Sequence, residues 1–335
     1  MILVTYGTRP EYIKVKPLMR EMSKQSIPFK TLFTGQHKDI APDDADYVWQ
    51  MDETENENRL NAILNSCLSM PSTFFMGITH VLVQGDTTSV LGIALTCMNR
   101  QIKVIHLEAG LRTYDKLNPY PEEYNRQLVS RIADIHLCPT TLNKLQLNNE
   151  NIVDGVHVVG NTVLDNLLEY KESCIYSDFV LVTLHRRENH KNMEYWFKEI
   201  NQLARENPHL EFILPLHPNP NVQKHKKLLK NVKVVKPLSH HDLIQVLTKS
   251  KLVITDSGGL QEECSFFNKR CLVCRETTER PEALKHSSVL IPHYSKLKMK
   301  FYNYITDYEI EDGNCPFGNG NSSQKICEIF QKYGT

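Results

Sequence analysis

The chain has 335 residues, which is enough for two domains that each bury a hydrophobic core of their own. Lysine and arginine together number 39, as do aspartate and glutamate, so the formal net charge is zero. No overall field therefore draws the protein to nucleic acid or to an anionic membrane. No apolar run approaches the roughly 20 residues that a membrane-spanning helix requires.

The first residues and the cysteines predict a cytoplasmic protein. Residues 1–6 lead straight into a polar loop and do not resemble a signal peptide. The nine cysteines are scattered, and an odd number cannot form a complete set of disulfides. Cys271 and Cys274 have the spacing of a metal-binding or redox pair, but no second pair lies nearby and their run is apolar. We predict a buried strand there and no metal site.

Strand patterns alternate with helix patterns along the first half of the chain. Strands are predicted at 2–6, 30–34, 80–84, 103–107, 134–138 and 156–159. Helices are predicted at 11–22, 60–75, 87–98, 142–149 and 163–171. Residues 40–60 are acidic and irregular, which indicates a surface excursion between the second strand and the second helix.

A second alternating series follows the polar break at 172–178. Its strands are predicted at 179–183, 212–216, 232–235, 252–255 and 270–274, and the tail at 319–332 has a helical pattern. Alternation of this kind is typical of parallel sheets with helices on both faces. The sequence therefore predicts two doubly wound, Rossmann-like α/β lobes with a cleft between them, at residues 1–170 and 171–320.

The stretch from His106 to Arg126 concentrates carboxylates and guanidinium groups just after a predicted strand. Open α/β sheets place their chemistry beyond the carboxyl ends of their strands. Glu108 follows the strand directly, and Arg112 and Glu122 lie in the proline-containing loop that enters the next helix. For the second half of the stretch the alternative is a solvated helix start, with Glu122 paired to Arg126 four residues on.

Two other loops of the first lobe carry candidate residues. Arg9 and Lys14 stand where a Rossmann dinucleotide site would show GxGxxG, and the absence of that fingerprint weighs against NAD. Beside a helix N-terminus they are candidate phosphate contacts, or else salt-bridge partners. Asp86 follows the strand at 80–84 and is either a functional carboxylate or the cap of the next helix.

In the second lobe His185 lies at a strand end, where it can titrate near neutrality; a structural histidine is the alternative. His217 lies in a second strand exit between prolines, and that pattern favours a structural turn. At 255–263 a strand ends, two glycines follow and a helix begins, an arrangement that can hold a diphosphate on free N–H groups. Glu263, one turn into that helix, could reach ribose hydroxyls, and Arg280 lies in a further charged strand exit.

These motifs together resemble the non-hydrolysing UDP-N-acetylglucosamine 2-epimerases, over nearly the whole chain. The matching segments are GTRPEYIK at 7–14, TGQH at 34–37, GDTT at 85–88, HLEAGLRT at 106–113, PEEYNR at 121–126, GNTVLD at 160–165, HRREN at 185–189, SGGLQEE at 257–263 and TTERPE at 277–282. The resemblance implies the two-lobed fold of GT-B glycosyltransferases, with the C-terminal helix at 321–335 on the first lobe. It also implies a homodimer that uses neither NAD nor metal.

What the resemblance implies for the activity is interconversion of UDP-GlcNAc and UDP-ManNAc, by anti elimination of UDP to 2-acetamidoglucal and re-addition. Removing the C2 proton needs a carboxylate base, and returning a proton to the other face needs a second acid. By motif match the acid/base carboxylates are Asp86, Glu108 and Glu122, and His185 assists departure of the diphosphate. The implied substrate-binding residues are Arg9, Lys14, Arg112, His217, Ser257, Gly258, Gly259, Glu263 and Arg280.

The chain departs from the family pattern in two places. Residues 39–79 match poorly and look shortened, and in many bacterial members this region helps form a pocket for an activating second UDP-GlcNAc. Gln84 stands where a histidine commonly precedes the GDT motif.

Four alternatives remain open beside this prediction. A hydrolysing epimerase would release free ManNAc and UDP, and a related branch of the family acts on UDP-diacetamido-uronic acids. A glycosyltransferase shares the fold, but it has no need of three carboxylates around C2. A non-catalytic nucleotide-sugar sensor would keep the motif at 257–263 and could lose Asp86, Glu108 or Glu122, all of which are present.

Overall fold

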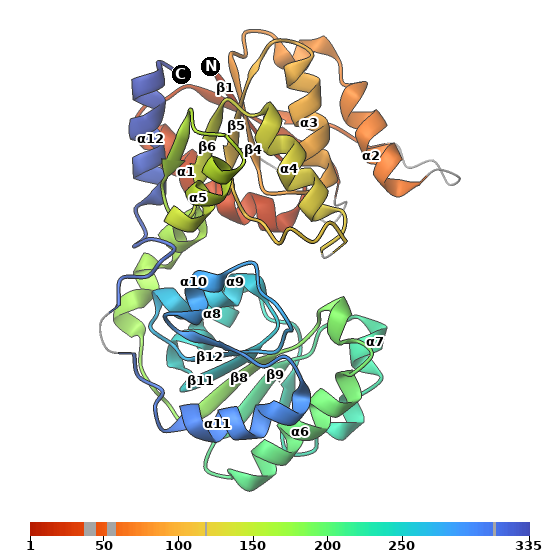
Figure 1. The fold of residues 1–335 in the computed structure, drawn as a ribbon, viewed down its shortest axis with the longest axis vertical. Coiled ribbons are helices and arrows are strands. Elements are labelled where there is room, and N and C mark those ends of the chain that lie inside the picture. Colours follow the sequence, from red (N-terminus) through yellow and green to blue (C-terminus); the bar gives the residue numbers. More distant parts are fainter. Residues whose placement is uncertain (37–44, 52–57, 118, 311–312) are drawn as a thin grey trace. The chain divides into compact units, whose positions relative to one another are not determined.

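The computed structural model describes residues 1–36, 45–51, 58–117, 119–310 and 313–335. The chain divides into two compact units (Figure 1). The first unit comprises Met1–Asn166 and Gly318–Thr335, and the second comprises Leu167–Phe317. Each unit contains one parallel β-sheet, of seven and six strands respectively. The protein is thus an α/β protein with two doubly wound units, as predicted.

The sheet of the first unit is built from two halves that wind outward from its centre. Its order is β3-β2-β1-β4-β5-β6-β7, and every pairing is parallel. The strands are β1 (Ile2–Tyr6), β2 (Phe29–Phe33), β3 (Tyr47–Val48), β4 (His80–Gln84), β5 (Lys103–Leu107), β6 (Ile135–Cys138) and β7 (Val156–Val158). The strand order reverses between β1 and β4, and doubly wound sheets bind their ligands beside such a point.

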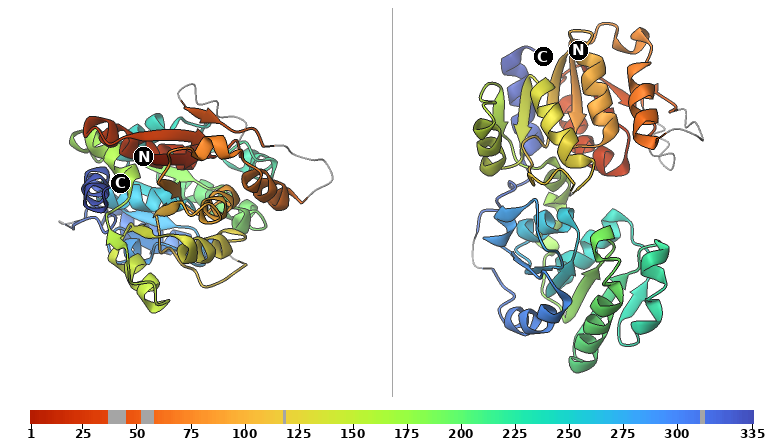
Figure 2. Two further views of the ribbon diagram at one scale, coloured as in Figure 1. Left: turned by 90° about the horizontal axis from the view of Figure 1, so that it is seen from above. Right: turned by 45° about the vertical axis from the view of Figure 1, so that its right-hand side comes forward.

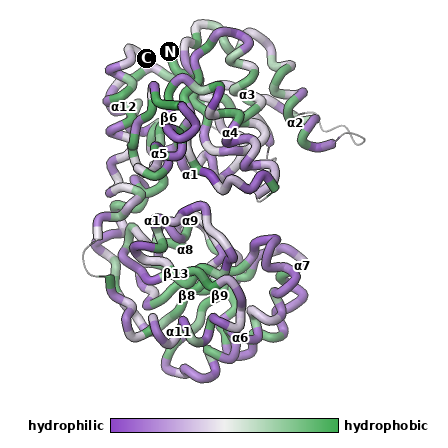
Figure 3. Tube along the Cα trace, viewed as in Figure 1, coloured by the Kyte–Doolittle hydropathy of each residue, from purple (hydrophilic) through white to green (hydrophobic). Residues whose placement is uncertain are grey.

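Both faces of this sheet are buried, because successive side chains of a strand point to opposite faces. Ile2 and Val4 belong to one core cluster and Leu3 to another. The first cluster includes side chains from α1 (Arg9–Lys24) and α12 (Ser322–Tyr333). The second includes side chains from α2 (Arg59–Leu68), α3 (Thr88–Met98) and α4 (Glu122–Ile132). Figure 3 shows that hydropathy varies along the trace, with apolar stretches in strands and mixed polar and apolar residues along helices.

Two predicted elements of the first unit differ from the structure. The helix predicted at 60–75 is two helices, because α2 ends at Leu68 and the 3₁₀ helix η1 (Ser72–Phe75) follows Pro71. A proline lacks the N–H group that would continue the helix. The helix predicted at 163–171 is the 3₁₀ helix η2 (Thr162–Ser173). Helix α5 (Thr141–Asn149) has nearly the predicted bounds, and most of the excursion predicted at 40–60 lies outside the described residues.

The start of η2 is hydrogen-bonded to α1, which carries the Arg9 and Lys14 side chains. Pro17 lies within α1, so the carbonyl of Ile13 lacks its helical donor. The side-chain amide of Asn166 donates to that carbonyl at 3.2 Å, and the Thr162 hydroxyl donates to the Lys14 carbonyl at 2.6 Å. The motif at 160–165 had no role in the sequence-based prediction. It begins a segment that is hydrogen-bonded to α1 and holds this helix in place.

The same motif holds the C-terminal helix. The Asp165 carboxylate accepts the backbone N–H groups of Ser322 at 3.0 Å and Ser323 at 2.6 Å, at the start of α12. A carboxylate at a helix N-terminus satisfies free N–H groups and interacts favourably with the helix dipole. Ile326 and Phe330 of α12 are fully buried in the core that contains β1 and α1.

The second unit has the strand order β10-β9-β8-β11-β12-β13, again all parallel. Figure 2 draws the ribbon from two further sides. Its strands are β8 (Phe179–Thr183), β9 (Glu211–Pro215), β10 (Lys233–Val235), β11 (Leu252–Thr255), β12 (Cys271–Val273) and β13 (Ser288–Leu290). Its helices are α6 (Met193–Glu206), α7 (Pro220–Gln223), α8 (His240–Lys249), α9 (Gly258–Phe266), α10 (Pro281–Leu284) and α11 (Leu297–Ile305), with 3₁₀ turns η3 (Arg187–Asn189), η4 (Lys226–Leu228) and η5 (Tyr294–Lys296). The strand order reverses between β8 and β11.

The structure agrees with the sequence-based prediction for Cys271 and Cys274. Cys271 is in β12 and Cys274 directly after it, and both are buried, which confirms the prediction of a buried strand. None of the nine cysteines forms a disulfide. Within the described residues, none of the helices has the length and apolar character needed to span a membrane.

Candidate active site

Glu108 lies just beyond the carboxyl end of β5, beside the point where the strand order of the first unit reverses. Its side chain is buried and its carboxylate forms an ion pair with the Lys14 ammonium of α1. The amide of Gln84, the last residue of β4, donates to the same carboxylate oxygen. Gln84 thus supplies a hydrogen bond to Glu108 at the position where the sequence departs from the family pattern. The structure brings together two of the predicted site residues, Glu108 and Lys14.

The backbone at Glu108 is strained. Its φ angle is +68°, in the left-handed region that a side chain with a Cβ seldom adopts. The N–H groups of Glu108 and Ala109 both donate to the carbonyl of Leu137, at 3.1 Å each, and hold this turn. Strain of this kind persists where the surroundings enforce it, and it is found preferentially at functional sites.

Asp86 follows β4 and pairs with Arg126 of α4. Its Oδ2 accepts from Arg126 Nε at 2.8 Å, and the side-chain amide of Asn125 donates to its carbonyl at 2.8 Å. The cap of α3 is Thr87, whose hydroxyl accepts the N–H of Val90. The alternative that Asp86 caps this helix is therefore wrong, because its carboxylate faces α4.

The two carboxylates at the start of α4 have different surroundings. Glu123 is fully buried and accepts the backbone N–H groups of Thr113 at 2.9 Å and Tyr114 at 3.2 Å, as well as Arg126 Nη1 at 3.2 Å. Burial alone would raise the pKa of Glu123, but these bonds outweigh it and lower the pKa. Arg126 thus pairs with Glu123 and Asp86, in place of the Glu122–Arg126 pair of the alternative interpretation.

Glu122 has an unpaired carboxylate oxygen. Its Oε2 is buried, and no hydrogen-bond partner lies within reach in the part of the chain that the structure describes. Burying an unpaired carboxylate oxygen costs free energy. A ligand hydroxyl or an acidic C–H group placed there would relieve that cost, which suits a proton-transfer role.

His106, which lies within β5, helps to hold the residue before Asp86 in place. His106 Nε2 donates to the carbonyl of Gly85 at 2.8 Å, and the Gly85 N–H donates to Leu107 at 3.0 Å. Gly85 has φ of +81°, which only glycine adopts without strain. Burial lowers the pKa of His106 to about 4, so the ring is neutral at pH 7, and the bond to a carbonyl places its proton on Nε2.

Glu11 joins the loops that follow β1 and β4. Its carboxylate accepts the N–H groups of Gly7 at 2.6 Å and Thr8 at 3.2 Å, and the hydroxyl of Thr87 at 2.8 Å. Burial raises the pKa of Glu11 to about 7 in spite of these bonds. Sequence reasoning missed Glu11 and His106 because each reads as an ordinary helix or strand residue.

The structure places the two predicted arginines of this unit differently. Arg9 is the first residue of α1 and is exposed. Arg112 is buried, and its Nε and Nη2 donate to the two carboxylate oxygens of Glu150 at 2.7 and 2.9 Å. A further bond from Arg112 reaches the Ser130 hydroxyl at 2.9 Å. This geometry gives Arg112 a structural role, and its predicted contact with substrate stays a prediction.

The buried titratable groups predict how stability depends on pH. His106 and His136 are register partners on neighbouring strands, and burial lowers the pKa of each to about 4. In the unfolded chain they titrate near their ordinary value, so acidification from about pH 6.5 to about 4 favours unfolding, by about 1.4 kcal/mol per pH unit for each group. Glu11 acts in the opposite sense, because its raised pKa costs stability as pH rises from about 4.5 to 7.

Urea unfolding between pH 7 and pH 5 measures these contributions. Glu11 gains a proton on acidification and thereby offsets part of the loss of stability. We expect Glu11→Gln to remove this offset and make the loss of stability steeper. We expect His136→Gln to make it shallower, whatever its effect on stability at pH 7. Equal slopes in the wild type and both variants would contradict these assignments.

In the second unit, His185 and Asp256 follow the neighbouring strands β8 and β11, at the point where the strand order reverses. Thr183 and Thr255, at the ends of these strands, are register partners whose hydroxyls lie 2.6 Å apart. His185 Nδ1 lies 3.5 Å from Asp256 Oδ1. The ring of His185 stacks on that of His217, with centroids 5.1 Å apart and planes inclined by 14°. The structure thus brings together the two predicted histidines.

The start of α9 has the features predicted for an anion site. Ser257 is the N-cap residue and makes no side-chain capping bond. The two glycines that follow it differ in their surroundings. A Cβ at Gly258 would lie 2.6 Å from Nη1 of Arg280, whereas a Cβ at Gly259 would meet no atom within 4 Å. Gly258 therefore makes room for a side chain of the protein itself, and Gly259 leaves the helix start open to a ligand.

Arg280 is largely enclosed by carboxylates. It forms ion pairs with Glu262 and, at 2.8 Å, with Glu279, which also pairs with Arg275 at 2.7 Å. Although burial would raise the pKa of Glu279, the surrounding arginines lower it well below its ordinary value. Arg280 thus has a structural role, and its contact with substrate stays a prediction. Glu263, the predicted ribose contact, accepts from His240 Nε2 at 2.9 Å.

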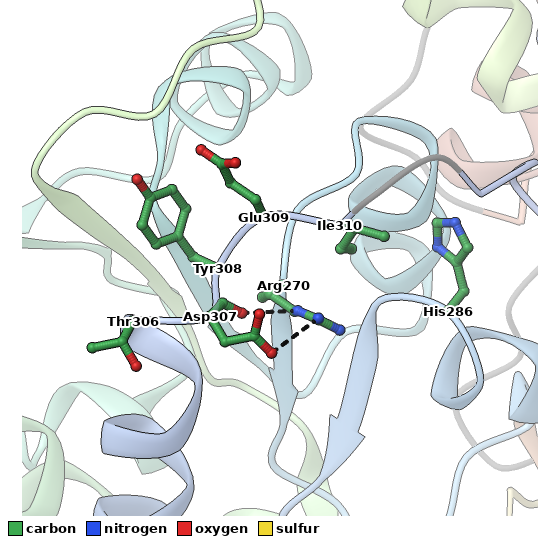
Figure 4. Close-up of a pocket in the computed structure, with 7 residues that line it drawn as sticks. All are labelled: Arg270, His286, Thr306, Asp307, Tyr308, Glu309 and Ile310. Atoms are coloured by element: carbon green, nitrogen blue, oxygen red, sulfur yellow. Dashed lines mark hydrogen bonds and ion pairs between the residues drawn. The ribbon is translucent and has the colours of Figure 1, made fainter.

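A separate open pocket of about 670 Å³ lies elsewhere in the second unit (Figure 4). Arg270 is at its centre and donates to the carbonyl and carboxylate of Asp307, at 3.0 and 3.2 Å. Arg270 precedes β12, so the pocket lies at the amino end of the sheet, and none of the predicted site residues lines it. Parallel sheets bind their ligands at the carboxyl end, which does not favour this pocket as the active site.

One protein-family model matches most of the length of the chain. The family model described as UDP-N-acetylglucosamine 2-epimerase matches residues 22–331. A UDP-N-acetylglucosamine 2-epimerase from Campylobacter jejuni is 35% identical, over 99% of this chain and 97% of that protein. The alignment extends over 379 residues and this chain has 335, so the relative contains segments that this chain lacks. The predicted shortening at 39–79 stays a prediction.

Solved structures agree with the fold. The UDP-GlcNAc 2-epimerase from Neisseria meningitidis, bound to UDP-GlcNAc, superposes with a TM-score of 0.84 at 33% identity and covers 99% of each chain. The enzyme from Methanocaldococcus jannaschii, in complex with UDP-GlcNAc and UDP, has a TM-score of 0.78 at 28% identity, with the same coverage.

Proposed function

The chain belongs to the UDP-N-acetylglucosamine 2-epimerase family, and we propose that it interconverts UDP-GlcNAc and UDP-ManNAc without releasing free sugar. The observation that carries the proposal is the group of carboxylates beside the switch point of the first unit. Glu108 is held by Lys14 and Gln84 on a strained turn, and Asp86 is held by Arg126. Proton transfer at C2 requires carboxylates held in this way.

The proposed reaction has two half-steps. A carboxylate removes the C2 proton, the C–H electron pair forms the C1=C2 double bond, and the C1–O bond breaks with its pair on the β-phosphate oxygen. UDP and 2-acetamidoglucal result. An acid on the other face then returns a proton to C2, and the UDP oxygen adds to C1. We assign these transfers to Asp86, Glu108 and Glu122 as a set.

Lys14 contributes by its charge. Its ammonium pairs with the carboxylate of Glu108 and orients it at the end of β5. The unpaired Oε2 of Glu122 is a second position for a proton. Because elimination and re-addition move protons and no hydride, the proposal includes neither NAD nor a metal.

We assign the UDP portion to the second unit. The open start of α9, at Gly259, offers backbone N–H groups to a diphosphate, and the hydroxyl of the N-cap residue Ser257 makes no capping bond. His185 lies beyond the neighbouring strand and would stabilise the charge of the departing diphosphate. Glu263, with His240 on its Oε1, is the proposed ribose contact, and Arg9 is a proposed phosphate contact from the first unit.

The cellular location and assembly are also proposals. Nine cysteines without a disulfide among them suit a reducing cytoplasm. The family resemblance favours a homodimer, and Tyr120, Tyr124 and Leu128 expose apolar surface at α4 that an interface could cover. Light scattering after size exclusion would give about twice the chain mass of 38.7 kDa for a dimer.

Proton NMR of the protein with UDP-GlcNAc in D2O tests the reaction. We expect deuterium at C2 and growing UDP-ManNAc, without added NAD or metal, because a proton removed from C2 exchanges with solvent before one is returned. Accumulation of free ManNAc with UDP would place the protein in the hydrolysing class. A protein that binds UDP-GlcNAc and exchanges no C2 proton would contradict the proposal.

A further inference from the structure

The carboxylate of Asp256 organises the loop that carries His185. It accepts the His185 N–H at 3.0 Å, the Arg186 N–H at 2.9 Å and Asn189 Nδ2 at 3.0 Å, and its side chain is fully buried. The amide of Asn189 also donates to the carbonyl of Cys274 at 2.9 Å, so the loop is joined to β12 as well. These bonds hold the backbone of His185 beside the carboxylate of Asp256.

In the part of the chain that the structure describes, no lysine or arginine forms an ion pair with Asp256. Over the described residues, His185 is the one side chain able to carry positive charge that lies within ion-pair distance of Asp256. A buried carboxylate is costly without such a partner. A proton on His185 Nδ1, 3.5 Å from Oδ1, would give the carboxylate a further N–H donor, and contacts of this length commonly shorten when ligand binds.

We infer that Asp256 is a positioning residue, which keeps a proton on Nδ1 of His185 and so makes Nε2 the ligand-facing atom of that ring. With Nδ1 turned toward Asp256, Nε2 is the ring atom that can contact a diphosphate oxygen. The stacked ring of His217 limits rotation of His185 away from this orientation. The role for the diphosphate rests on the proposed function, whereas the tautomer does not.

The tautomer is measured directly by long-range ¹H–¹⁵N correlation on the ¹⁵N-histidine-labelled full-length protein without substrate. His185→Gln assigns the signals, and His209→Gln, an exposed histidine, is the matched control. We expect Nδ1 of His185 to be protonated. A neutral ring that carries its proton on Nε2 would overturn the inference, whichever nucleotide sugar the protein uses.

Activity is tested with a double-mutant cycle of Asp256→Asn and His185→Gln, followed by C2 deuterium exchange. We expect Asp256→Asn alone to lower kcat by roughly 10- to 100-fold with a smaller change in KM, and to cost no further activity in the His185→Gln background. An equal loss in both backgrounds would show that Asp256 acts through the loop structure alone, and would overturn the inference.

Unfolding temperature and UDP binding of the same variants show whether the loop has kept its structure. If the wild type fails to exchange the C2 proton of UDP-GlcNAc, the proposed function fails and the tautomer result still decides the inference. The two proposals therefore fail by different measurements.

Discussion

Glu108→Gln is expected to lower kcat for C2 deuterium exchange by roughly 10²- to 10⁴-fold, the range that general acid–base groups contribute. Glutamine keeps the shape of the side chain and cannot take up a proton. It also loses the ion pair with Lys14, so the ammonium would face an amide oxygen. KM is expected to change far less than kcat, because the group acts on the reacting C–H bond. Exchange in D2O, followed by NMR under saturating UDP-GlcNAc, gives the rate.

A matched control is available on α1. Glu21 is partly exposed, and its ion pair with Lys24 is a surface pair of the kind that contributes little. Glu21→Gln should leave kcat and the unfolding temperature unchanged. If Glu108→Gln also retained wild-type kcat while remaining folded, the carboxylates of this unit would not transfer the C2 proton, and another nucleotide-sugar reaction would have to be considered.

The central strands could be predicted from the sequence to the residue. β1, β4, β5, β8 and β11 have the predicted bounds, because strands covered on both faces are apolar along nearly their whole length. The edge strands β3 and β13 were missed. β3 is two residues long, and Val48 is 50% exposed, so neither its length nor its pattern distinguishes it from a loop.

That several candidate side chains lie together was predictable for a related reason. Charged residues at the ends of central strands must meet at one edge of a parallel sheet, which is why Glu108 and Lys14 come together, as do His185 and His217. Asp256 was passed over because an aspartate before Ser-Gly-Gly reads as part of a loop. The parallel pairing of β8 with β11 places it beside the loop after β8, whose N–H groups it accepts.

The partners of the charged side chains in ion pairs could not be predicted from the sequence. The sequence offers pairs three or four residues apart on a helix, such as Glu122 with Arg126, whereas Arg126 reaches Asp86, 40 residues away. Arg280 likewise pairs with Glu262 from another helix. Long-range pairs depend on how separate elements pack, and local spacing does not encode that.

The second large effect is expected at the two glycines that begin α9. An alanine should lower stability at Gly258 and weaken ligand binding at Gly259. Gly258→Ala places a Cβ 2.6 Å from Arg280 Nη1 and 3.1 Å from Glu279 Oε1. Arg280 cannot move aside freely, since Glu262 and Glu279 hold it in a buried position. We expect a loss of about 1–3 kcal/mol of unfolding free energy, as for other overpacked sites, measured by urea unfolding.

Gly259→Ala is the matched variant, since its Cβ would meet no protein atom within 4 Å. Stability should therefore stay within about 0.5 kcal/mol of the wild type. If the diphosphate approaches the backbone there, the methyl group should raise the Kd for UDP by roughly tenfold, or about 1.4 kcal/mol, by calorimetry. Unchanged UDP binding in Gly259→Ala would remove the start of α9 from the proposed site, whereas unchanged stability in Gly258→Ala would mean that Arg280 yields more easily than its carboxylate partners indicate.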